Sequence, residues 1–380
     1  MKPIETLGVI GGGQLGRMLT LDAKRMGYHV ITLDPQEHSP CGQVADEQIV
    51  AAYSDLEAIE ELGRRSDVIT YEFENIDIAS VRHLEASSHR VTPSSGVLHV
   101  TQNRLREKQF VRSIGLATTP FERVRTPEDL GAAIERVGFP AILKTAEGGY
   151  DGKGQSRAGS REEAEAALAA AGGAELIFER TVPLACELSV VATRNAHDET
   201  VSYPVAENTH DHGILTMTVA PARVESRVAE RAQEAALAVG RGLGIVGTYC
   251  VEFFLAVSGE LLVNEIAPRP HNSGHYTIDV TPCSQYEQHV RAICDLPLSP
   301  PRLLANAVMM NLLGDGNGDH LAGVTELLRD PSIVLHVYGK RHAVARRKMG
   351  HFTMLVDGPV DEVAIARAEA AHAKLHWVPR

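Results

Sequence analysis

The sequence lacks the features of a membrane or secreted protein. A membrane-spanning helix needs about 18 consecutive apolar residues, and no apolar run in this 380-residue chain is that long. The first five residues do not have the basic and then apolar order of a signal peptide. The cysteines are scattered and form no CxxC pair, so we expect reduced thiols rather than disulfides or zinc ligands. These absences predict a cytoplasmic protein with no membrane partner.

An excess of positive charge is also absent. The net charge is −12, which argues against a nucleic-acid partner. Basic residues nevertheless gather between positions 340 and 348, namely Lys340, Arg341, Arg346, Arg347 and Lys348. Such a cluster is either a solvated loop or a local anion site. We predict a clamp for a phosphate group, in which Arg347 offers a bidentate fork and Lys340 and Lys348 act as point charges.

The N-terminal quarter alternates strand and helix patterns. The length of the chain predicts two or three domains. Residues 1 to about 95 contain short apolar runs that are typical of buried strands, at 6–10, 29–34 and 67–71. Strands that alternate with helices predict a doubly wound parallel sheet.

The rest of the chain has three further regions. Residues from about 106 to 180 predict a small α+β lobe, whose first helix is capped by Thr126. Strand patterns dominate 184–270, apart from a helix over 228–243. The tail from about 300 alternates short strands with turns and ends in an alanine-rich helix.

A glycine-rich turn follows the first strand. Residues 11–16, Gly-Gly-Gly-Gln-Leu-Gly, fit the dinucleotide fingerprint, and Asp34 ends the second strand at the position of its ribose acid. The same residues also suit a tight turn whose helix N-terminus faces an anion or solvent. We favour the second interpretation, because stronger nucleotide signals lie elsewhere in the chain.

One of those signals is a glycine-rich loop over 147–155. It is flanked by Lys144, which lies on a predicted strand, and it contains Lys153. Its glycines let backbone N–H groups approach phosphate oxygens, and the two lysines would neutralise a triphosphate. The loop is not a Walker A loop, since GxxxxGK[ST] is absent. The alternative is a flexible hairpin with solvated lysines.

Two glutamates form the strongest signal. Residues 249–255 and 261–266 alternate as strands, and Ser258-Gly259 suits a two-residue turn between them. In that register Glu252 lies opposite Glu265, and like charges so placed repel unless a cation lies between them. Magnesium is the natural cation. Asn264 would point to the other face unless the strand twists there, and the alternative interpretation is a pair of exposed strand glutamates.

The segment after the second strand is dense in polar groups. Between Glu265 and His275 it contains Arg269, His271, Asn272 and Ser273. The guanidinium of Arg269 suits an oxyanion such as bicarbonate. Either histidine could be structural, but the density of polar groups after a buried strand makes a functional role the better interpretation.

At these residues the sequence resembles the ATP-grasp superfamily and, within it, the 5-(carboxyamino)imidazole ribonucleotide synthases of purine biosynthesis. The resemblance rests on GGGQLGRM at 11–18, GGYDGKGQ at 148–155, Val251-Glu252-Phe253, NEIAPRPHNSGHYT at 264–277 and YGK…RRKMGH over 338–351. It implies an α/β and α+β fold with an N-terminal doubly wound domain (1–105), an ATP-grasp domain (106–296, small lobe about 106–182) and a small C-terminal domain (297–380).

The resemblance also implies the reaction. Bicarbonate attacks the γ-phosphate of ATP, and the resulting carboxyphosphate delivers its carboxyl group to the exocyclic amine of 5-aminoimidazole ribonucleotide. ATP and Mg²⁺ are the implied cofactors, and a homodimer is implied. The remaining alternatives are another ATP-grasp ligase, such as a formate-dependent glycinamide ribonucleotide transformylase or biotin carboxylase, a Rossmann-type oxidoreductase, and a non-catalytic ATP-binding regulator.

Site residues carry over by the same resemblance. Those implied to be catalytic are Tyr150, Asp151, Lys153, Arg269 and His271. Those implied to bind ATP are Arg104, Lys144, Gly149, Tyr150, Asp151, Gly152, Lys153, Gly154, Gln155, Glu179, Arg180, Thr181, Val182, Glu187, His210, Asn264 and Glu265. Those implied to bind the other substrates are Arg269, His271, Asn272, Ser273, Lys340, Arg347 and Lys348. Glu252 and Glu265 would hold the metal. One departure is the acidic Glu147, which leaves the anchoring of the glycine-rich loop open.

Overall fold

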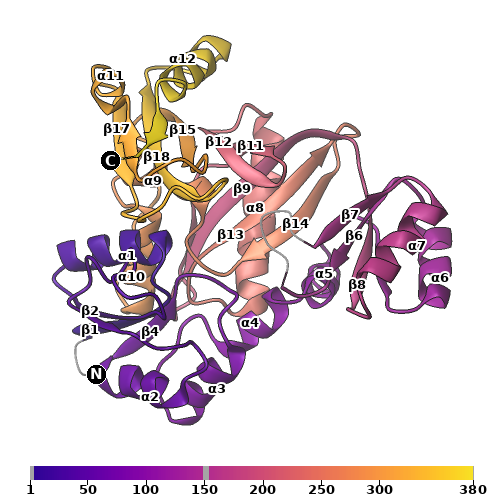
Figure 1. Ribbon diagram of the computed structural model, residues 1–380, viewed down its shortest axis with the longest axis horizontal. Coiled ribbons are helices and arrows are strands. Elements are labelled where there is room, and N and C mark those ends of the chain that lie inside the picture. The colour runs from indigo at the N-terminus through magenta and orange to yellow at the C-terminus, as the bar shows by residue number, and fades with distance from the viewer. Residues whose placement is uncertain (1–3, 149–153, 380) are drawn as a thin grey trace.

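A computed structural model describes residues 4–148 and 154–379. The chain folds into an N-terminal part, a small lobe and a long central sheet that continues into the C-terminal part (Figure 1). The predictions for Gly149, Tyr150, Asp151, Gly152 and Lys153 fall outside the described residues.

The N-terminal part contains the parallel sheet that the sequence predicts. Its strand order is β3-β2-β1-β4, and every neighbouring pair is parallel. The strands are β1 (Thr6–Ile10), β2 (His29–Leu33), β3 (Glu47–Ile49) and β4 (Val68–Tyr71). The helices are α1 (Gln14–Arg25), α2 (Leu56–Arg65), α3 (Ile78–Ala86) and α4 (Ser95–Thr101). The three buried strands confirm the prediction, whereas β3 is a short edge strand that lacks an apolar run.

The small lobe is a four-stranded antiparallel sheet with two helices on one side (Figure 1). Its strands are β5 (Phe121–Val124), β6 (Ala141–Thr145), β7 (Gln155–Ala158) and β8 (Leu176–Arg180), and its helices are α6 (Pro127–Val137) and α7 (Arg161–Ala170). Thr126 and Asp129 form the capping box at the start of α6. The helix α5 (Arg104–Ser113) connects this lobe to the N-terminal part.

One large sheet forms the centre of the molecule. Its order is β14-β13-β9-β11-β12-β15-β18-β17, with β10 paired to β9. The central strands are β9 (Leu184–Arg194), β10 (Thr200–Ser202), β11 (Ala206–Asp211), β12 (Ile214–Ala220), β13 (Gly247–Ala256) and β14 (Leu261–Ala267). The helix predicted over 228–243 is α8 (Ser226–Leu243).

The C-terminal part shares this sheet. Its strands are β15 (Asn306–Leu313), β17 (Ile333–Val337) and β18 (Lys348–Val356), followed by α12 (Glu362–His372). Pairing of β12 with β15 carries the sheet across position 297. The domain boundaries therefore stay predictions, because the sheet itself has no break there.

The N-terminal part is fixed firmly to the central part. Helix α1 packs on α10 (Gln285–Ile293), and Met18, Tyr286 and Tyr338 lie in one buried cluster. The ion pair Arg90–Asp295 (2.6 Å) joins the same two parts. As a result, the strand ends of the parallel sheet keep a fixed position relative to the central hairpin. Within the described ranges, no helix has the length and apolar character needed to span a bilayer.

Candidate active site

Two carboxylates face each other on the hairpin formed by β13 and β14. Glu252 pairs directly with Glu265, as the sequence predicts. The register shifts by one residue between Glu252 and Phe253, because Val263 and not Asn264 lies opposite Phe253. Asn264 is therefore the extra residue of a β-bulge, which bends and twists a strand locally. This bulge is the distortion that Asn264 needs to reach the same face as the glutamates.

The predicted two-residue turn at Ser258-Gly259 is wrong. Leu255 pairs with Leu261, and the amide of Ala256 donates to the carbonyl of Glu260. The loop therefore has three residues, 257–259, one more than predicted. That extra residue shifts the register by one, and the bulge at Asn264 shifts it back. The predicted pairing holds because two one-residue irregularities cancel.

The two carboxylates differ in environment, since Glu252 is partly buried and Glu265 is exposed. Burial, together with the neighbouring charge of Glu265, raises the pKa of Glu252 to about 7. A third carboxylate, Glu107 on α5, is also buried, and burial with the charge of Glu265 raises its pKa well above the usual range. The facing carboxylates of Glu252 and Glu265 suit a divalent cation, which would relieve their repulsion. The residues present therefore fit Mg²⁺.

His271 is held beside this pair. Its Nε2 lies 3.3 Å from Oε1 of Glu252, and its Nδ1 hydrogen-bonds the Ser273 hydroxyl at 2.8 Å. Ser273 also accepts a hydrogen bond from Ser189 on β9. Burial and nearby cations, Arg269 foremost, lower the pKa of His271 well below its usual value. The imidazole is therefore neutral and fixed in orientation.

Asn272 has an unusual environment. The residue is 6% exposed, and within the described part of the chain neither Nδ2 nor Oδ1 of its amide has a hydrogen-bond partner. Buried polar groups are normally paired, and one left unpaired costs about 1–3 kcal/mol. An amide in this state, next to His271, is placed to bind a ligand.

The guanidinium of Arg269 is engaged by Glu74 from the N-terminal part. Its Nη2 donates to Oε1 of Glu74 at 3.1 Å, and its Nε donates to Oε2 of the same carboxylate. The bidentate edge predicted to bind bicarbonate is thus occupied by a side chain. Charge from this buried pair still reaches the site, since Arg269 is the main cation acting on His271.

The predicted ATP-binding end contains a buried charge network. Lys144 on β6 lies 2.9 Å from Glu179 Oε2, and Lys108 on α5 lies 3.1 Å from its Oε1. Glu179 is 3% exposed, and despite burial the two lysines lower its pKa to about 2. The Glu179 side chain is therefore used inside the protein, and it positions Lys144.

The hinge, residues 180–182 at the end of β8, already uses two of its backbone amides within the protein. The amides of Arg180 and Thr181 donate to the carbonyls of Pro120 and Pro140, and Val182 follows them. In the central sheet, Glu187 on β9 pairs with His210 on β11, with 2.8 Å between Oε2 and Nδ1. Burial opposes the charged imidazole, but the contact with Glu187 and the charge of Glu252 raise the pKa of His210 overall.

The described ends of the glycine-rich loop are anchored. Arg104 Nη1 donates to the carbonyl of Thr145 at 3.3 Å, and Gln155 pairs with Lys144 in the β6–β7 ladder. Gly154 has φ +71°, and a Cβ there would approach Thr145 Oγ1 to 2.8 Å. Glu147, whose charge left the anchoring open, accepts hydrogen bonds of 3.0 Å from Asn103 and from Arg106 on α5. It is therefore neutralised and ties the loop to this helix.

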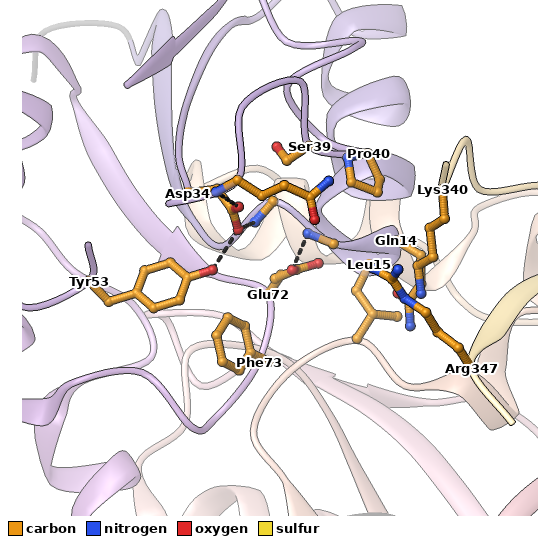
Figure 2. A pocket seen from close by; sticks show the side chains of 13 residues that line it. Gln14, Leu15, Asp34, Ser39, Pro40, Tyr53, Glu72, Phe73, Lys340 and Arg347 are labelled. Atoms are coloured by element: carbon orange, nitrogen blue, oxygen red, sulfur yellow. Dashed lines mark hydrogen bonds between the residues drawn. The ribbon is translucent and has the colours of Figure 1, made fainter. Parts of the chain in front are cut away.

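A pocket of about 330 Å³ opens at the carboxyl ends of β1, β2 and β4. Figure 2 shows Asp34, Tyr53 and Glu72 on one side of it and Lys340 and Arg347 on the other. Its full lining is Gly12, Gly13, Gln14, Leu15, Asp34, Gln36, Ser39, Pro40, Tyr53, Glu72, Phe73, Lys340 and Arg347. This is the edge at which open parallel sheets bind ligands.

The N-terminus of α1 is already occupied by an internal anion. Glu72 accepts hydrogen bonds from the amides of Gly13 and Gly16, the latter at 2.7 Å. Asp34 accepts from the amide of Gly12 at 2.7 Å and from the Tyr53 hydroxyl at 2.5 Å. A dinucleotide would place its pyrophosphate at this helix end. The carboxylates therefore oppose binding of a pyrophosphate at this turn.

The C-terminal basic cluster divides into parts. Lys340 and Arg347 line the pocket, whereas Arg346 pairs with Asp211 at 3.3 Å. Arg341 is exposed. Lys348 begins β18, and its charge acts on Glu252 and His271. Two cations thus face the pocket, and a third lies toward the carboxylate pair.

Three family models match successive parts of the chain. They are described as the ribonucleotide synthetase preATP-grasp domain (residues 4–102), the ATP-grasp domain (109–286) and the phosphoribosylaminoimidazole carboxylase C-terminal domain (307–364). The N5-carboxyaminoimidazole ribonucleotide synthase of Bacillus subtilis (strain 168) is 45% identical over 365 residues, which cover 95% of this chain and 93% of the relative. The chain belongs to this family. It is therefore an ATP-dependent ligase of the ATP-grasp type.

Solved structures of family members have the same fold. The synthetase from Thermotoga maritima superposes with a TM-score of 0.90 and 41% identity, covering 99% of this chain and 100% of the other. A structure from Aspergillus clavatus, in complex with ADP and 5-aminoimidazole ribonucleotide, has a TM-score of 0.88 and 32% identity, covering 98% and 97%. Membership of the family confirms the fold class and the ATP-grasp resemblance predicted from the motifs.

Several residues that line or support the site were not predicted as such from the sequence. These are Glu72, Glu74, Glu107 and Lys108, together with Asp34 and Tyr53 as pocket residues. A usable signal was present for some of them, since Asp34 and Glu72 each directly follow a buried parallel strand. Glu107 and Lys108 carried none, because they lie within an ordinary helical pattern.

Proposed function

We propose that this chain carboxylates the exocyclic amine of 5-aminoimidazole ribonucleotide with bicarbonate at the expense of ATP. The products are 5-(carboxyamino)imidazole ribonucleotide, ADP and phosphate, in purine biosynthesis. One arrangement carries the proposal: residues 72–74 link the two halves of the site. Glu72 lines the pocket at the end of the parallel sheet, and Glu74 holds Arg269 beside His271. The relative from Aspergillus clavatus binds ADP and 5-aminoimidazole ribonucleotide together.

ATP would lie between the small lobe and the central sheet. In this proposal Lys144 contacts the phosphates, the Val182 end of the hinge meets adenine, and Glu187 with His210 faces the ribose. Arg104 and the ends of the loop at Gly154 and Gln155 close the phosphate side. Gly149, Tyr150, Asp151, Gly152 and Lys153 are assigned to the same loop by resemblance and lie outside the described residues.

Glu252 and Glu265 would hold Mg²⁺, with Asn264 beside them. The ion would neutralise charge on the phosphates during phosphoryl transfer, a reaction that depends on positioning and charge more than on covalent help. The chain's own residues do the remaining work. Lys144, kept in place by Glu179, supplies a fixed positive charge, and His271 keeps its neutral imidazole against Glu252.

The carboxylation step would take place beside His271 and Asn272. The unpaired amide of Asn272 offers both a donor and an acceptor to bicarbonate or to the imidazole of the substrate. Arg269 contributes charge through the part of its guanidinium that Glu74 does not occupy. Ser273 orients His271 and does not itself need to contact the substrate. Carboxyphosphate hydrolyses readily, so this part of the site must exclude water.

The ribonucleotide would occupy the pocket at the ends of β1, β2 and β4. Its 5′-phosphate would meet Lys340 and Arg347, with Lys348 on the side nearest Glu252. In this proposal the N-terminal domain binds a mononucleotide and not the dinucleotide suggested by its fingerprint. The ribonucleotide lies across the pocket and not at the helix end filled by Glu72. A homodimer and the boundaries at 105 and 296 are part of the same proposal.

An ADP-release assay tests the proposal. ADP should form only when ATP, bicarbonate and 5-aminoimidazole ribonucleotide are all present, and omission of any one should stop it. Formate supplied in place of bicarbonate should give no product, which separates this reaction from the formate-dependent ligases. ADP release that needs formate, or that is equally fast without the ribonucleotide, would disprove the assignment.

A further inference from the structure

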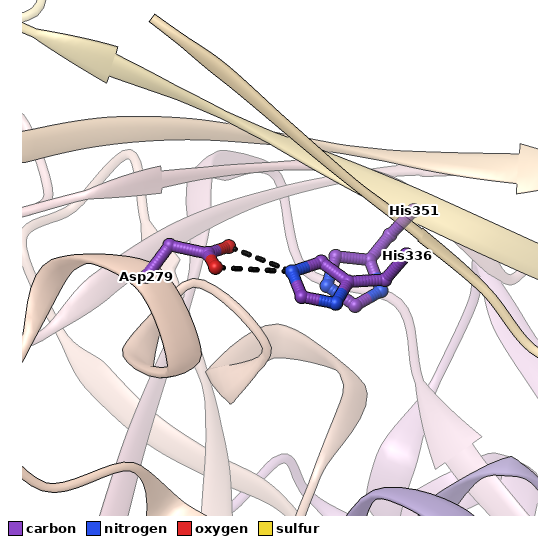
Figure 3. Close-up of side chains that lie close together, drawn as sticks. All are labelled: Asp279, His336 and His351. Carbon is purple, nitrogen blue, oxygen red and sulfur yellow. Dashed lines mark hydrogen bonds and ion pairs between the residues drawn. The ribbon is translucent and has the colours of Figure 1, made fainter. Parts of the chain in front are cut away.

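A cluster of metal-binding side chains lies apart from the active-site residues. Asp279 on α9 (Thr277–Val280), His336 on β17 and His351 on β18 each place one ligand atom within 4.8 Å of the other two. Figure 3 shows the carboxylate of Asp279 facing the two imidazoles across the gap between α9 and the strands. Among the described residues, these three form the only such group of histidine, cysteine and acidic side chains.

The two histidines are held side by side by the sheet. His336 and His351 are direct partners in the β17–β18 ladder, so their Cβ atoms are close and both rings lie on one face. The rings stack with centroids 4.5 Å apart and an angle of 16° between them. Both imidazoles can therefore direct a nitrogen toward the same point.

Asp279 is at the right separation from His336. The two carboxylate oxygens lie 3.0 and 3.1 Å from Nε2 of His336. Two ligands that are each about 2.0–2.1 Å from a tetrahedral zinc ion lie roughly 3.3 Å apart. A metal ion would therefore need only a small adjustment of these side chains.

The surroundings of His351 indicate a bound ligand independently of the distances within the cluster. Its Nδ1 hydrogen-bonds the hydroxyl of Tyr338 at 2.8 Å, and its Nε2 is buried and has no hydrogen-bond partner within the described ranges. The ring is fully buried. Metal-binding histidines are normally fixed through their second nitrogen in this way, and a buried nitrogen without a partner is costly unless something binds it.

We propose that Asp279, His336 and His351 form a binding site for a divalent transition metal such as zinc, with water completing the coordination. Two imidazoles and one carboxylate favour zinc over magnesium, which prefers oxygen ligands. The site is distinct from the carboxylate pair Glu252–Glu265. His336 is partly exposed, so an ion can enter from that side.

The position of the site gives it a structural consequence. Asp279 follows the segment that carries His271 and Asn272, while β17 and β18 lead to Lys340 and Lys348. A bound ion would join the C-terminal strands to the central part immediately behind the predicted phosphate clamp. Metal binding should therefore raise the melting temperature of the whole chain.

Calorimetric titration of the full chain tests this proposal. The protein is first treated with a chelator and then saturated with MgADP, so that the oxygen-ligand site is filled. Zinc chloride should then bind with a stoichiometry of about one. His336→Gln should weaken this binding at least tenfold, and Asp279→Asn should do the same. His320→Gln, at an exposed histidine on the short strand β16 (His320–Ala322), should bind like the wild type.

Thermal melts give a second readout. Zinc should raise the melting temperature of the wild type and of His320→Gln, and excess chelator should reverse the rise. Absence of zinc binding to the wild type at about 100 µM would overturn the proposal. So would His336→Gln binding as tightly as the wild type, or loss of the zinc equivalent in Glu252→Gln with its retention in Asp279→Asn. A melting-temperature rise that is the same in His336→Gln would contradict it independently of calorimetry.

Discussion

Glu252 and Glu265 lie directly opposite each other across the β13–β14 ladder, one residue from the bulge formed by Asn264. Burial and the charge of Glu265 together raise the pKa of Glu252 to about 7. The hairpin thus holds two acidic groups at a separation that only a cation makes favourable.

Removing either charge should abolish most of the activity and leave the fold intact. Glu252→Gln or Glu265→Gln should lower ADP release roughly a hundredfold or more, because charge stabilisation by a metal contributes several kcal/mol. The metal-free protein should melt at the same temperature or slightly higher, since repulsion of a few tenths of a kcal/mol is relieved. Glu260→Gln, at the exposed hairpin tip, is the matched control. Unchanged Mg²⁺-dependent ADP binding by calorimetry in both variants would show that this pair is not the metal site.

Metal binding should depend on pH through Glu252. Its pKa of about 7 in the metal-free protein exceeds the value of about 4.3 for an exposed glutamate, and metal ligands must be deprotonated. Mg²⁺ binding should therefore release a proton below about pH 7, and affinity should fall up to about tenfold per pH unit. Calorimetry in two buffers with different ionisation enthalpies measures the proton release. Equal release by the wild type and Glu252→Gln at pH 6 would contradict the assignment.

The same pKa shift has a consequence for stability. A raised pKa in the folded state contributes stability that is fully present below the unfolded pKa and is lost as pH rises through the folded value. The metal-free chain should therefore lose stability between about pH 4.3 and about pH 7 through this group, and Mg²⁺ should restore part of it above pH 7. Denaturant unfolding at several pH values, with and without Mg²⁺, measures both effects.

Arg347 should contribute to binding of the ribonucleotide and not to binding of ATP. Arg347→Ala removes a cation from the pocket wall, which should cost about 1.5–3 kcal/mol for a charge-assisted contact, or ten- to hundredfold in KM for 5-aminoimidazole ribonucleotide. Lys340→Ala and Lys348→Ala should act in the same direction. The KM for ATP should stay near that of the wild type, and added salt should narrow the difference. Arg341→Ala, at an exposed position, is the control. An equal effect on KM in that variant would indicate that the cluster is a solvated loop and not a phosphate clamp.

Substitution of Asn272 should lower activity without lowering stability. Because its amide is buried without a partner, Asn272→Ala should leave the melting temperature unchanged or raise it, while catalytic efficiency should fall about tenfold or more. Asn208→Ala is the matched control, since the Asn208 amide bonds Ser189 and Thr218 at 2.9 Å each. That variant should lose about 1–3 kcal/mol of stability. If Asn272→Ala is destabilised as much as Asn208→Ala, the amide has a structural role instead.

Gly13 should be intolerant of a side chain. A Cβ at this position would clash with Oε1 of Glu72, so Gly13→Ala should be destabilised by about 1–3 kcal/mol and should raise the KM for the ribonucleotide. The wild type should bind no NAD, NADP or FAD at about 100 µM, because Glu72 fills the helix end. Gly96→Ala is the control, since the nearest atom, Ser94 Oγ, lies 3.6 Å from the added carbon. Saturable fluorescence changes with any of the dinucleotides would contradict this view.

Local patterns predicted the elements and the register well. The strands at 6–10, 29–34 and 67–71, the capped helix after Thr126 and the opposition of Glu252 and Glu265 follow from periodicity and capping. The length of the hairpin loop did not, because a three-residue loop and a compensating bulge leave the same alternation of apolar and polar residues. The turn type is decided by backbone geometry that this alternation does not encode.

Contacts between distant segments were beyond sequence patterns. Glu74 and Arg269 are 195 positions apart, and the pocket gathers residues from five separated segments. For this reason the sequence predicted a guanidinium of Arg269 that is free to bind an oxyanion, since nothing near Arg269 in the sequence indicates a carboxylate partner. Likewise, the ion pairs of the Glu179 side chain with Lys108 and Lys144 could not be read from the sequence, although they leave open its predicted backbone contact with adenine.

The compensation within the β13–β14 hairpin limits how this chain can change in length. Loss of one residue from β13 between Phe253 and Ala256, with the 257–259 loop kept, would place Glu252 opposite Val263 and out of register with Glu265. Such a deletion should inactivate the enzyme. A change in the length of the exposed loop itself leaves the pairing of Leu255 with Leu261, and with it the carboxylate pair, in place. The hairpin can therefore change length at its tip but not between the tip and the bulge, and homologous hairpins should be aligned on the bulge at Asn264.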